Sequence, residues 1–302
     1  MNATDGRFCG IYKCGNRQLE IGKKTLIMGI LNLTPDSFSD GGRYNDVDAA
    51  VDRCSLMIRE GADCIDLGAE ATGPNSVPIS AEEELERLIP ALEAIRSRFD
   101  IPLSVDTFKS ETANAAITAG CDIINDITGF RGDPEMAKVV ADNGVGAILM
   151  FNKRTNGENP IAYEPISRRA VRELTESVEI AKKAGIPDNM IMTDPGIGFG
   201  TNRIEDAELT AATLSMGLQG KYPVLYAASR KRYARVFAGG DQATEAMLDN
   251  ATAGLSMTAA SLGAAMVRVH NVAASRQVLD VFDTSFYAFA NICVFERIME
   301  IG

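Results

Sequence analysis

Two groups of reactive side chains stand directly after short apolar segments of this sequence. They are the acidic or amide residues Asp106, Asn125 and Asp194, and the basic residues Lys231, Arg268 and His270. Paired carboxylate oxygens accept hydrogen bonds from the ring N–H and amino groups of a 2-amino-4-oxo heterocycle. Neighbouring cations would hold an anionic group. The combination predicts a site for an amino-rich ring that is joined to a phosphate.

Each of these residues has an ordinary structural explanation when it is taken alone. An Asp at the end of a strand often caps the helix that follows. Asp194-Pro195-Gly196 is a common turn sequence, and Arg268 and His270 could form a surface pair. Six such residues that converge on one face of a fold are harder to explain in this way.

Eight short apolar segments that suit β-strands alternate with longer amphipathic segments that suit helices. The predicted strands are residues 25–31, 62–68, 101–105, 121–125, 146–150, 190–193, 222–227 and 265–269. The predicted helices are residues 47–60, 81–98, 110–119, 135–143, 165–184 and 245–262. Several helices end at a glycine, such as Gly61 and Gly144, which tolerates the left-handed conformation that stops a helix. Ser80 and Glu83 fit an N-terminal capping box.

Strands that are apolar on both faces and alternate with helices indicate a parallel sheet covered by helices. Eight such units favour an α/β fold of the (β/α)8 TIM-barrel type, with one domain over residues 24–302. An open doubly wound sheet is the alternative, but no Gly-x-Gly-x-x-Gly follows the first strand. Residues 1–23 are predicted to form a hairpin, with its turn at Gly15-Asn16, that closes the bottom of the barrel. In a barrel the loops after the strands converge, so the reactive residues are expected to meet there.

The composition narrows the range of functions. The chain has 302 residues and a net charge of -11, which argues against a nucleic-acid partner because that would need clustered Lys and Arg. A single histidine and the absence of any Cys-x-x-Cys pair make a zinc site improbable. No apolar run reaches the roughly 20 residues that span a bilayer, and no signal peptide is visible. We therefore expect a cytoplasmic protein with no membrane partner, and a homodimer, since many barrels of this size form dimers.

Seven longer motifs occur between about residues 25 and 272. They are residues 28–42, 63–74, 104–107, 123–126, 194–199, 229–231 and 268–270. In order and spacing they resemble the signatures of the dihydropteroate synthases, and the first matches almost residue for residue. The resemblance implies a transferase of folate biosynthesis that condenses 7,8-dihydropterin-6-ylmethyl diphosphate with p-aminobenzoate and releases diphosphate.

The resemblance also implies roles for individual residues. Asn32 would help to hold the diphosphate and Mg²⁺, the implied cofactor. The residues implied to bind substrates are Thr72, Asp106, Asn125, Met150, Asp194, Phe199, Lys231, Arg232, Arg268 and His270. Of these, the implied catalytic residues are Asp106, Lys231, Arg268 and His270.

Within that set, the resemblance divides the residues between the two ends of the first substrate. The pterin would be bound by Asp106, Asn125, Asp194 and Lys231, with Met150 packing on it. The diphosphate end would be contacted by Thr72, Arg268 and His270.

The implied reaction is a displacement at the exocyclic methylene carbon of the pterin. Loss of diphosphate leaves a cation that is delocalised into the ring, and the arylamine then attacks. Mg²⁺, Arg268 and His270 are expected to neutralise the leaving group, and Asp106 and Asp194 to stabilise the ring cation. The first two loops would close to exclude water from this cation.

This sequence departs from the family pattern on one side of the site. The second loop usually reads Ser-Thr-Arg-Pro-Gly, but here Gly73 stands in place of the arginine. Other departures are Thr201-Asn202 for a Lys-Thr pair, Phe151 for a histidine, Arg232 for a serine and Asn271 for an aspartate. Either Arg232 compensates for the missing cation, or the chain binds pterin and uses another acceptor, or none.

Two other functions remain open. A methyltetrahydrofolate-dependent methyltransferase would share the pterin acids but would not need a diphosphate clamp, so the first loop and Arg268-x-His270 count against it. A pterin-binding protein without turnover would keep the whole pocket. Diphosphate release, measured with and without p-aminobenzoate, separates these functions.

Overall fold

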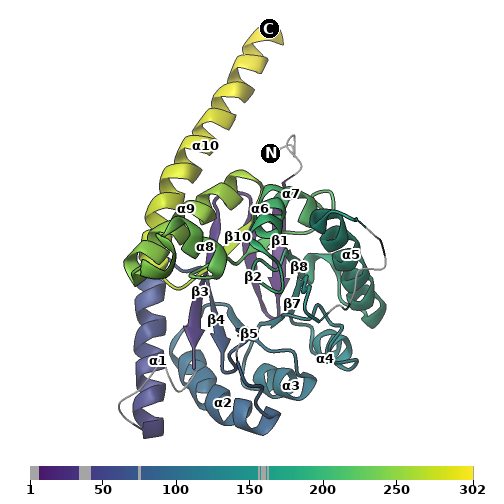
Figure 1. The fold of residues 1–302 in the computed structure, drawn as a ribbon, viewed down its shortest axis with the longest axis vertical. Coiled ribbons are helices and arrows are strands. Elements are labelled where there is room, and N and C mark those ends of the chain that lie inside the picture. The colour runs from purple at the N-terminus through teal and green to yellow at the C-terminus, as the bar shows by residue number, and fades with distance from the viewer. Residues whose placement is uncertain are drawn as a thin grey trace.

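The computed structural model describes residues 7–33, 42–73, 76–155, 157, 161 and 163–301, without the side chains of residues 42–46 and 287–301. Within these ranges, eight parallel strands form a barrel that is surrounded by helices (Figure 1). The strands are β3 (Leu26–Asn32), β4 (Cys64–Gly68), β5 (Leu103–Asp106), β6 (Ile123–Asp126), β7 (Gly146–Met150), β8 (Ile191–Asp194), β9 (Leu225–Tyr226) and β10 (Met266–Val269). Each overlaps a predicted strand, so the predicted barrel is confirmed.

The barrel closes between β8 and β9. The order of the strands is β8-β7-β6-β5-β4-β3-β10-β9, and a single parallel bridge between Thr193 and Val224 joins the two ends. Pro223 precedes this bridge and has no N–H group, so it cannot donate a hydrogen bond to β8. Its carbonyl accepts a hydrogen bond from Thr193 N at 3.0 Å. The open doubly wound sheet is therefore excluded.

Helices follow the strands and pack around the barrel. They are α1 (Gly42–Arg59), α2 (Ala81–Arg98), α3 (Ser110–Thr118), α4 (Met136–Asn143), α5 (Ile166–Ala184), α6 (Arg203–Ala211), α7 (Thr213–Met216), α8 (Arg232–Phe237), α9 (Glu245–Ser261) and α10 (Val272–Ile301). The six predicted helices are all present. Gly144 and Gly185 end α4 and α5 with φ of 63° and 104°, a conformation that side chains with a Cβ rarely adopt. Ser80 Oγ accepts a hydrogen bond from Glu83 N, as the capping sequence predicts.

Four of the helices, α6, α7, α8 and α10, fall outside the six predicted ranges. The signal for α6 is present in the sequence, because Asn202 and Glu205 form a capping box at its first turn. By contrast, α8 has only six residues and begins directly after Lys231, so its apolar periodicity is too short to detect.

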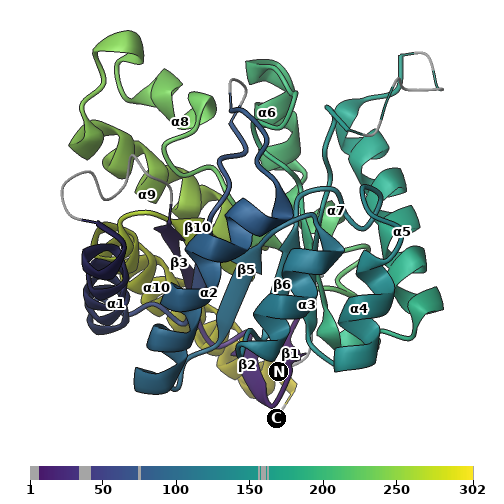
Figure 2. The same ribbon diagram turned by 90° about the horizontal axis from the view of Figure 1, so that it is seen from below.

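The predicted N-terminal hairpin consists of β1 (Gly10–Cys14) and β2 (Arg17–Ile21), with Gly15-Asn16 at the turn. Figure 2 shows it at one end of the barrel, opposite the end where α8 begins. Tyr12 is fully buried among the lower barrel residues, and its hydroxyl donates to the Ala147 carbonyl at 3.2 Å. The hairpin therefore covers the bottom of the barrel and leaves the other end open for a site.

The last helix, α10, packs against α9 and then extends away from the barrel (Figure 1). Asp283 fixes its position, since this carboxylate accepts hydrogen bonds from Thr25 N and Thr25 Oγ1, both at 2.8 Å. Arg276 pairs with the same carboxylate at 3.2 Å. No helix in the described part of the chain combines the length and the apolar character that crossing a membrane requires.

Candidate active site

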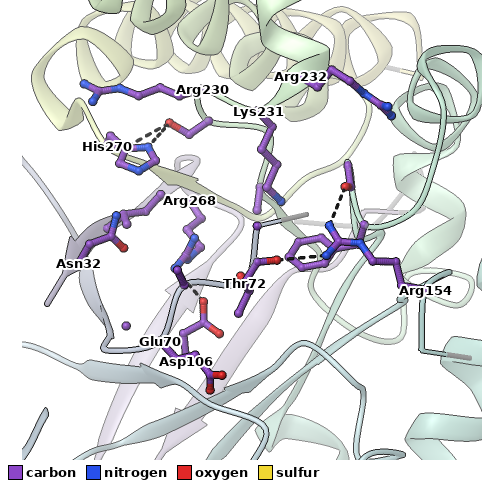
Figure 3. Close-up of a pocket in the computed structure, with 18 of the residues that line it drawn as sticks. Asn32, Glu70, Thr72, Asp106, Arg154, Arg230, Lys231, Arg232, Arg268 and His270 are labelled. Carbon is purple, nitrogen blue, oxygen red and sulfur yellow. Dashed lines mark hydrogen bonds and ion pairs between the residues drawn. The ribbon is translucent and has the colours of Figure 1, made fainter. Parts of the chain in front are cut away.

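A cavity of about 680 Å³ opens at the C-terminal ends of the barrel strands (Figure 3). Eight of the residues predicted for the site line it: Asn32, Thr72, Asp106, Phe199, Lys231, Arg232, Arg268 and His270. Asn125, Met150 and Asp194 do not line the cavity, and each is buried. The barrel thus brings most of the predicted residues together and keeps three of them in the surrounding core.

The inner part of the cavity contains an ion-pair network with Arg268 at its centre. Arg268 Nε lies 2.6 Å from Asp66 Oδ2, and Arg268 Nη2 lies 3.0 Å from Asp106 Oδ2. Asn125 Nδ2 donates to Asp66 Oδ2 at 3.3 Å. The second oxygens of the two carboxylates, Asp66 Oδ1 and Asp106 Oδ1, are buried and accept no hydrogen bond from the described residues. Because such acceptors are costly to bury without a donor, a ligand with N–H groups would satisfy them.

Burial also shifts the ionisation of this region. It raises the pKa of Asp106 to about 7, although the nearby Arg268 opposes the shift. It raises the pKa of Asp194 to about 6, where Lys231 is the main opposing charge. Burial lowers the pKa of Lys231 to about 8, while Asp194 acts to raise it. The pKa values of these three groups therefore lie near neutral pH, which is common for residues of functional sites.

Asp194 and Met150 lie side by side at the ends of β8 and β7, where their Cα atoms are partners in the sheet register. Asp194 Oδ1 accepts a hydrogen bond from Gly196 N at 2.7 Å, so this carboxylate also shapes the turn after β8. Lys231 Nζ donates to the Ile197 carbonyl at 2.9 Å. Asp194 therefore has two roles. It stabilises the turn that Asp194-Pro195-Gly196 predicts, and it provides negative charge near the site.

His270 lies at the side of the cavity where Asn32 ends β3 (Figure 3). Ser229 Oγ accepts the backbone N–H of His270 at 3.1 Å and lies 2.9 Å from its Nδ1. Burial, with help from Arg230 and Arg268, lowers the pKa of His270 to about 3. The imidazole is therefore neutral, and a proton donated by Ser229 to Nδ1 would leave Nε2–H as a donor.

Two predicted roles on this side of the cavity stay predictions. His270 is expected to contact the leaving group, and its lowered pKa makes it a neutral hydrogen-bond donor. Arg268 is expected at the diphosphate end. Among the described residues it pairs with Asp66 and Asp106, because two buried carboxylates are strong partners for a guanidinium.

The other side of the cavity contains Thr72, Phe199 and two arginines. Arg232 donates to the Thr201 carbonyl and lies 3.9 Å from Asp206 Oδ2. Arg154 lies with its guanidinium carbon 5.2 Å from the centre of the Phe199 ring. This side therefore offers an aromatic surface next to two cations.

Several residues that line the cavity or lie next to it were missed by the sequence analysis. Asp66 could have been found, because it is the one charged residue in the otherwise apolar strand Cys64–Gly68. Glu70 lines the cavity and pairs with Lys109 at 2.5 Å, but nothing in its sequence context marks this. Arg154 belongs to an ordinary-looking polar loop after β7, so only the folded chain brings it to the site.

Mg²⁺ is the cofactor that the family resemblance implies. Among the described side chains, no three His, Cys, Asp or Glu residues are grouped so that they could share a metal ion. Asn32 presents an amide at the cavity, and an amide oxygen is a hard ligand of the kind Mg²⁺ accepts. Mg²⁺ commonly binds through substrate phosphates and few protein ligands, so Asn32 fits this mode of binding. Residues 34–41 of the first loop, and Pro74 and Asn75 of the second, lie outside the described residues.

Comparison with known proteins gives the same family as the motifs. The family described as "Pterin binding enzyme" matches residues 28–270. A dihydropteroate synthase of Clostridium beijerinckii is 46% identical over 219 residues, which are 72% of this chain and 79% of that protein.

Solved structures agree with this result. The Xanthomonas albilineans dihydropteroate synthase with 4-aminobenzoic acid superimposes with a TM-score of 0.84 at 36% identity, covering 91% of this chain and 97% of the other. The same enzyme in complex with 7,8-dihydropteroate gives a TM-score of 0.81 at 35% identity, over 91% and 98% of the two chains. The resemblance seen in the motifs is confirmed, and the chain belongs to the pterin binding enzymes as a relative of the dihydropteroate synthases.

Proposed function

We propose that this protein is a transferase of the dihydropteroate synthase type. It condenses 7,8-dihydropterin-6-ylmethyl diphosphate with p-aminobenzoate and releases diphosphate, a reaction of folate biosynthesis. The observation that carries the proposal is the pair of buried carboxylate oxygens, Asp66 Oδ1 and Asp106 Oδ1, that lack hydrogen-bond donors among the described residues. Asp106 lines a cavity that also contains an aromatic surface and several cations, and the fully buried Asp66 is linked to it through Arg268.

The pterin would bind with its amino and ring N–H groups toward Asp106, which lines the cavity. Asp106 Oδ1 would then gain the donor that it lacks, and the ligand would favour the charged form of this carboxylate. Asp194 is buried outside the lining of the cavity and would add negative charge near the ring. This preorganised charge stabilises the cation that forms when the leaving group departs.

The diphosphate would lie on the side of Asn32 and His270. His270 Nε2–H would donate to a diphosphate oxygen, and Ser229 would hold the ring in the correct orientation. Asn32 would hold Mg²⁺, which supplies positive charge to the diphosphate when it is bound. The bond between the methylene carbon and the diphosphate oxygen breaks, and the electron pair leaves with the diphosphate.

The arylamine would approach from the opposite side, over Phe199 and beside Thr72. Its nitrogen forms the new bond to the methylene carbon and then loses one proton. An arylamine is uncharged at neutral pH, so no strong base is needed to activate it. This agrees with a site whose only histidine is engaged by Ser229.

The test is to measure diphosphate release from the pterin diphosphate with and without p-aminobenzoate, and to identify the product by mass spectrometry. We expect release that depends on p-aminobenzoate, together with dihydropteroate in equal amount. Release that ignores p-aminobenzoate would indicate a different acceptor. Tight pterin binding without any release would indicate a pterin-binding protein that lacks turnover.

We also propose that residues 24–302 form one catalytic domain with residues 1–23 as its lower cap, and that the protein acts in the cytoplasm as a homodimer. The family membership and the size of the barrel support a dimer. Light scattering on the purified chain tests this, and a mass near 32.4 kDa would contradict it.

A further inference from the structure

Arg154, in the loop after β7, lines the cavity and reaches the loops that carry Thr72 and Gly198 (Figure 3). We propose that it binds the carboxylate of the arylamine acceptor and so replaces the arginine that the second loop lacks. The proposal rests on the proposed function, because it concerns the second substrate of the same reaction.

The side chain of Arg154 is held by two backbone carbonyls. Its Nη1 donates to the Thr72 carbonyl at 3.2 Å and its Nη2 to the Gly198 carbonyl at 3.5 Å. A guanidinium has five N–H groups, so these two bonds leave others available. The anchored group is a planar donor of the shape that carboxylates accept with two oxygens.

The charge of Arg154 is not balanced within the described structure. The cavity is lined by Arg154, Arg230, Arg232 and Arg268. Each of the last three has a carboxylate oxygen nearby, at 2.7, 3.9 and 2.6 Å respectively. Arg154 has no such partner among the described residues, although the chain as a whole carries a net charge of -11. An anion from outside the chain would match it.

The position of Arg154 indicates which anion this is. In Figure 3, Arg154 lies across the cavity from Asn32 and His270, where the leaving group is placed. The acceptor has its amine and its carboxylate at opposite ends of a flat ring. If the amine points toward the methylene carbon and the ring lies over Phe199, the carboxylate points out toward Arg154.

The second loop leaves room for this arrangement. Among the residues that the structure describes, a Cβ at Gly73 would meet only Ser76 Oγ, at 4.0 Å, so these residues leave room beside Thr72. Arg154 reaches Thr72 from another loop and brings a guanidinium to the place that Gly73 leaves without one. Arg232 is less suited to this role, because it is directed to the Thr201 carbonyl and to Asp206.

The experiment compares p-aminobenzoate with p-aminobenzamide, which is neutral but keeps the same ring and amine. Steady-state kinetics are measured for wild type, Arg154→Met, Arg154→Lys and Arg232→Met, with the exposed Arg98→Met as a matched control. Arg154→Met should lower kcat/KM for p-aminobenzoate about tenfold or more and change the value for the amide less than about twofold. Arg154→Lys should retain part of the preference for p-aminobenzoate over p-aminobenzamide. The KM for the pterin diphosphate should not change in either Arg154 variant.

Equal losses for the two acceptors in Arg154→Met would overturn the proposal, since Arg154 would then only hold the loops together. A loss of preference in Arg232→Met alone would overturn it as well. Failure of the wild type to turn over would instead count against the proposed function. In that case calorimetry with the two arylamines, in the presence of the pterin diphosphate, still decides whether Arg154 recognises the carboxylate.

Discussion

Asp106 connects the electrostatics of the cavity to its proposed ligand. One of its oxygens pairs with Arg268 at 3.0 Å, and the other is buried and lacks a hydrogen bond from the described residues. Burial raises its pKa, and only the nearby Arg268 and Lys231 favour its charged form. A ligand that donates N–H groups to Asp106 would therefore gain most from the ionised carboxylate.

We predict that Asp106→Asn strongly weakens the binding of the pterin diphosphate. The amide removes the charged acceptor and leaves Arg268 with one carboxylate fewer, a change that costs about 3 kcal/mol or roughly 100-fold in affinity. Calorimetry measures the loss directly. Asp142→Asn, on the exposed side of α4, is the matched control and should bind normally. Unchanged affinity in Asp106→Asn would refute the role of this residue.

The pH dependence of binding follows from the same group. Because burial raises the pKa of Asp106 to about 7, the carboxylate gains a proton as the pH falls through that value. Pterin diphosphate affinity should be highest between about pH 7 and 8 and should fall roughly tenfold for each unit below 7. Above about pH 8 it should fall again, because Lys231, whose pKa burial lowers to about 8, loses its charge there. His270, with a pKa lowered to about 3, does not titrate in this range. Calorimetry between pH 5.5 and 8.5 tests the expectation, and an affinity that rises in acid would contradict it.

At the scale of elements, the second loop is held by a buried network at its base. Lys109 pairs with Glu70 at 2.5 Å and with Glu84 of α2 at 2.9 Å. Glu70 Oε1 accepts Ile79 N at 3.2 Å, which joins the two ends of the loop. One lysine therefore fixes the loop that carries Thr72 to the barrel.

We predict that Lys109→Met lowers the free energy of unfolding by about 3 kcal/mol, because two buried carboxylates lose their cation. The KM for the pterin diphosphate should rise as the loop is released. Urea denaturation and steady-state kinetics measure the two effects. Lys138→Met removes an exposed lysine that pairs only within α4, and it should leave the stability unchanged. Equal behaviour of the two variants would show that the network does not hold the loop.

The changes at Gly73 in this loop and at Arg232 in α8 predict the response to sulfonamides, which mimic p-aminobenzoate. A sulfonamide has no carboxylate, and here Gly73 and Arg232 alter the pocket around that end of the acceptor. We expect weaker inhibition than for a dihydropteroate synthase whose second loop contains the usual arginine. The test is to measure the inhibition constants of a sulfonamide for this protein and for such a synthase under the same conditions. Equal constants would argue against a reshaped acceptor pocket.

At the scale of the whole molecule, the hairpin and the cavity occupy opposite ends of one barrel. The hairpin residues Tyr12, Cys14, Leu19 and Ile21 join a buried cluster with lower barrel residues such as Met28. The upper end instead carries the charged groups of the cavity. Stability and chemistry are thus separated along the barrel axis, as in other barrels of this type.

We predict that Tyr12→Ala destabilises the protein by roughly 3–5 kcal/mol, the usual effect of removing a large buried aromatic side chain. The kinetic constants of the folded fraction should not change, since Tyr12 lies far from the cavity. Chemical denaturation and kinetics at low temperature measure both effects. Tyr163→Ala, at an exposed position, is the control and should be neutral. A stable Tyr12→Ala variant with altered kinetics would contradict this separation.

Local patterns in the sequence were sufficient to predict most of the elements. The eight barrel strands and six of the helices follow from apolar periodicity and from glycines such as Gly144, whose conformation depends on a few neighbouring residues. Residue type and position at a strand end also identified Asp106, Lys231 and His270 as site residues that line one cavity. These features depend on short stretches of chain, which a single sequence displays directly.

The tertiary structure alone decided the contacts between distant segments. It paired Arg268 with Asp66, 202 residues apart, made His270 neutral through burial and brought Arg154 next to Thr72. It also buried Asp194 outside the lining of the cavity. Ion pairing, burial and pKa depend on which groups the closed barrel brings within a few ångströms. That proximity belongs to the packed barrel as a whole, and no local stretch of sequence encodes it.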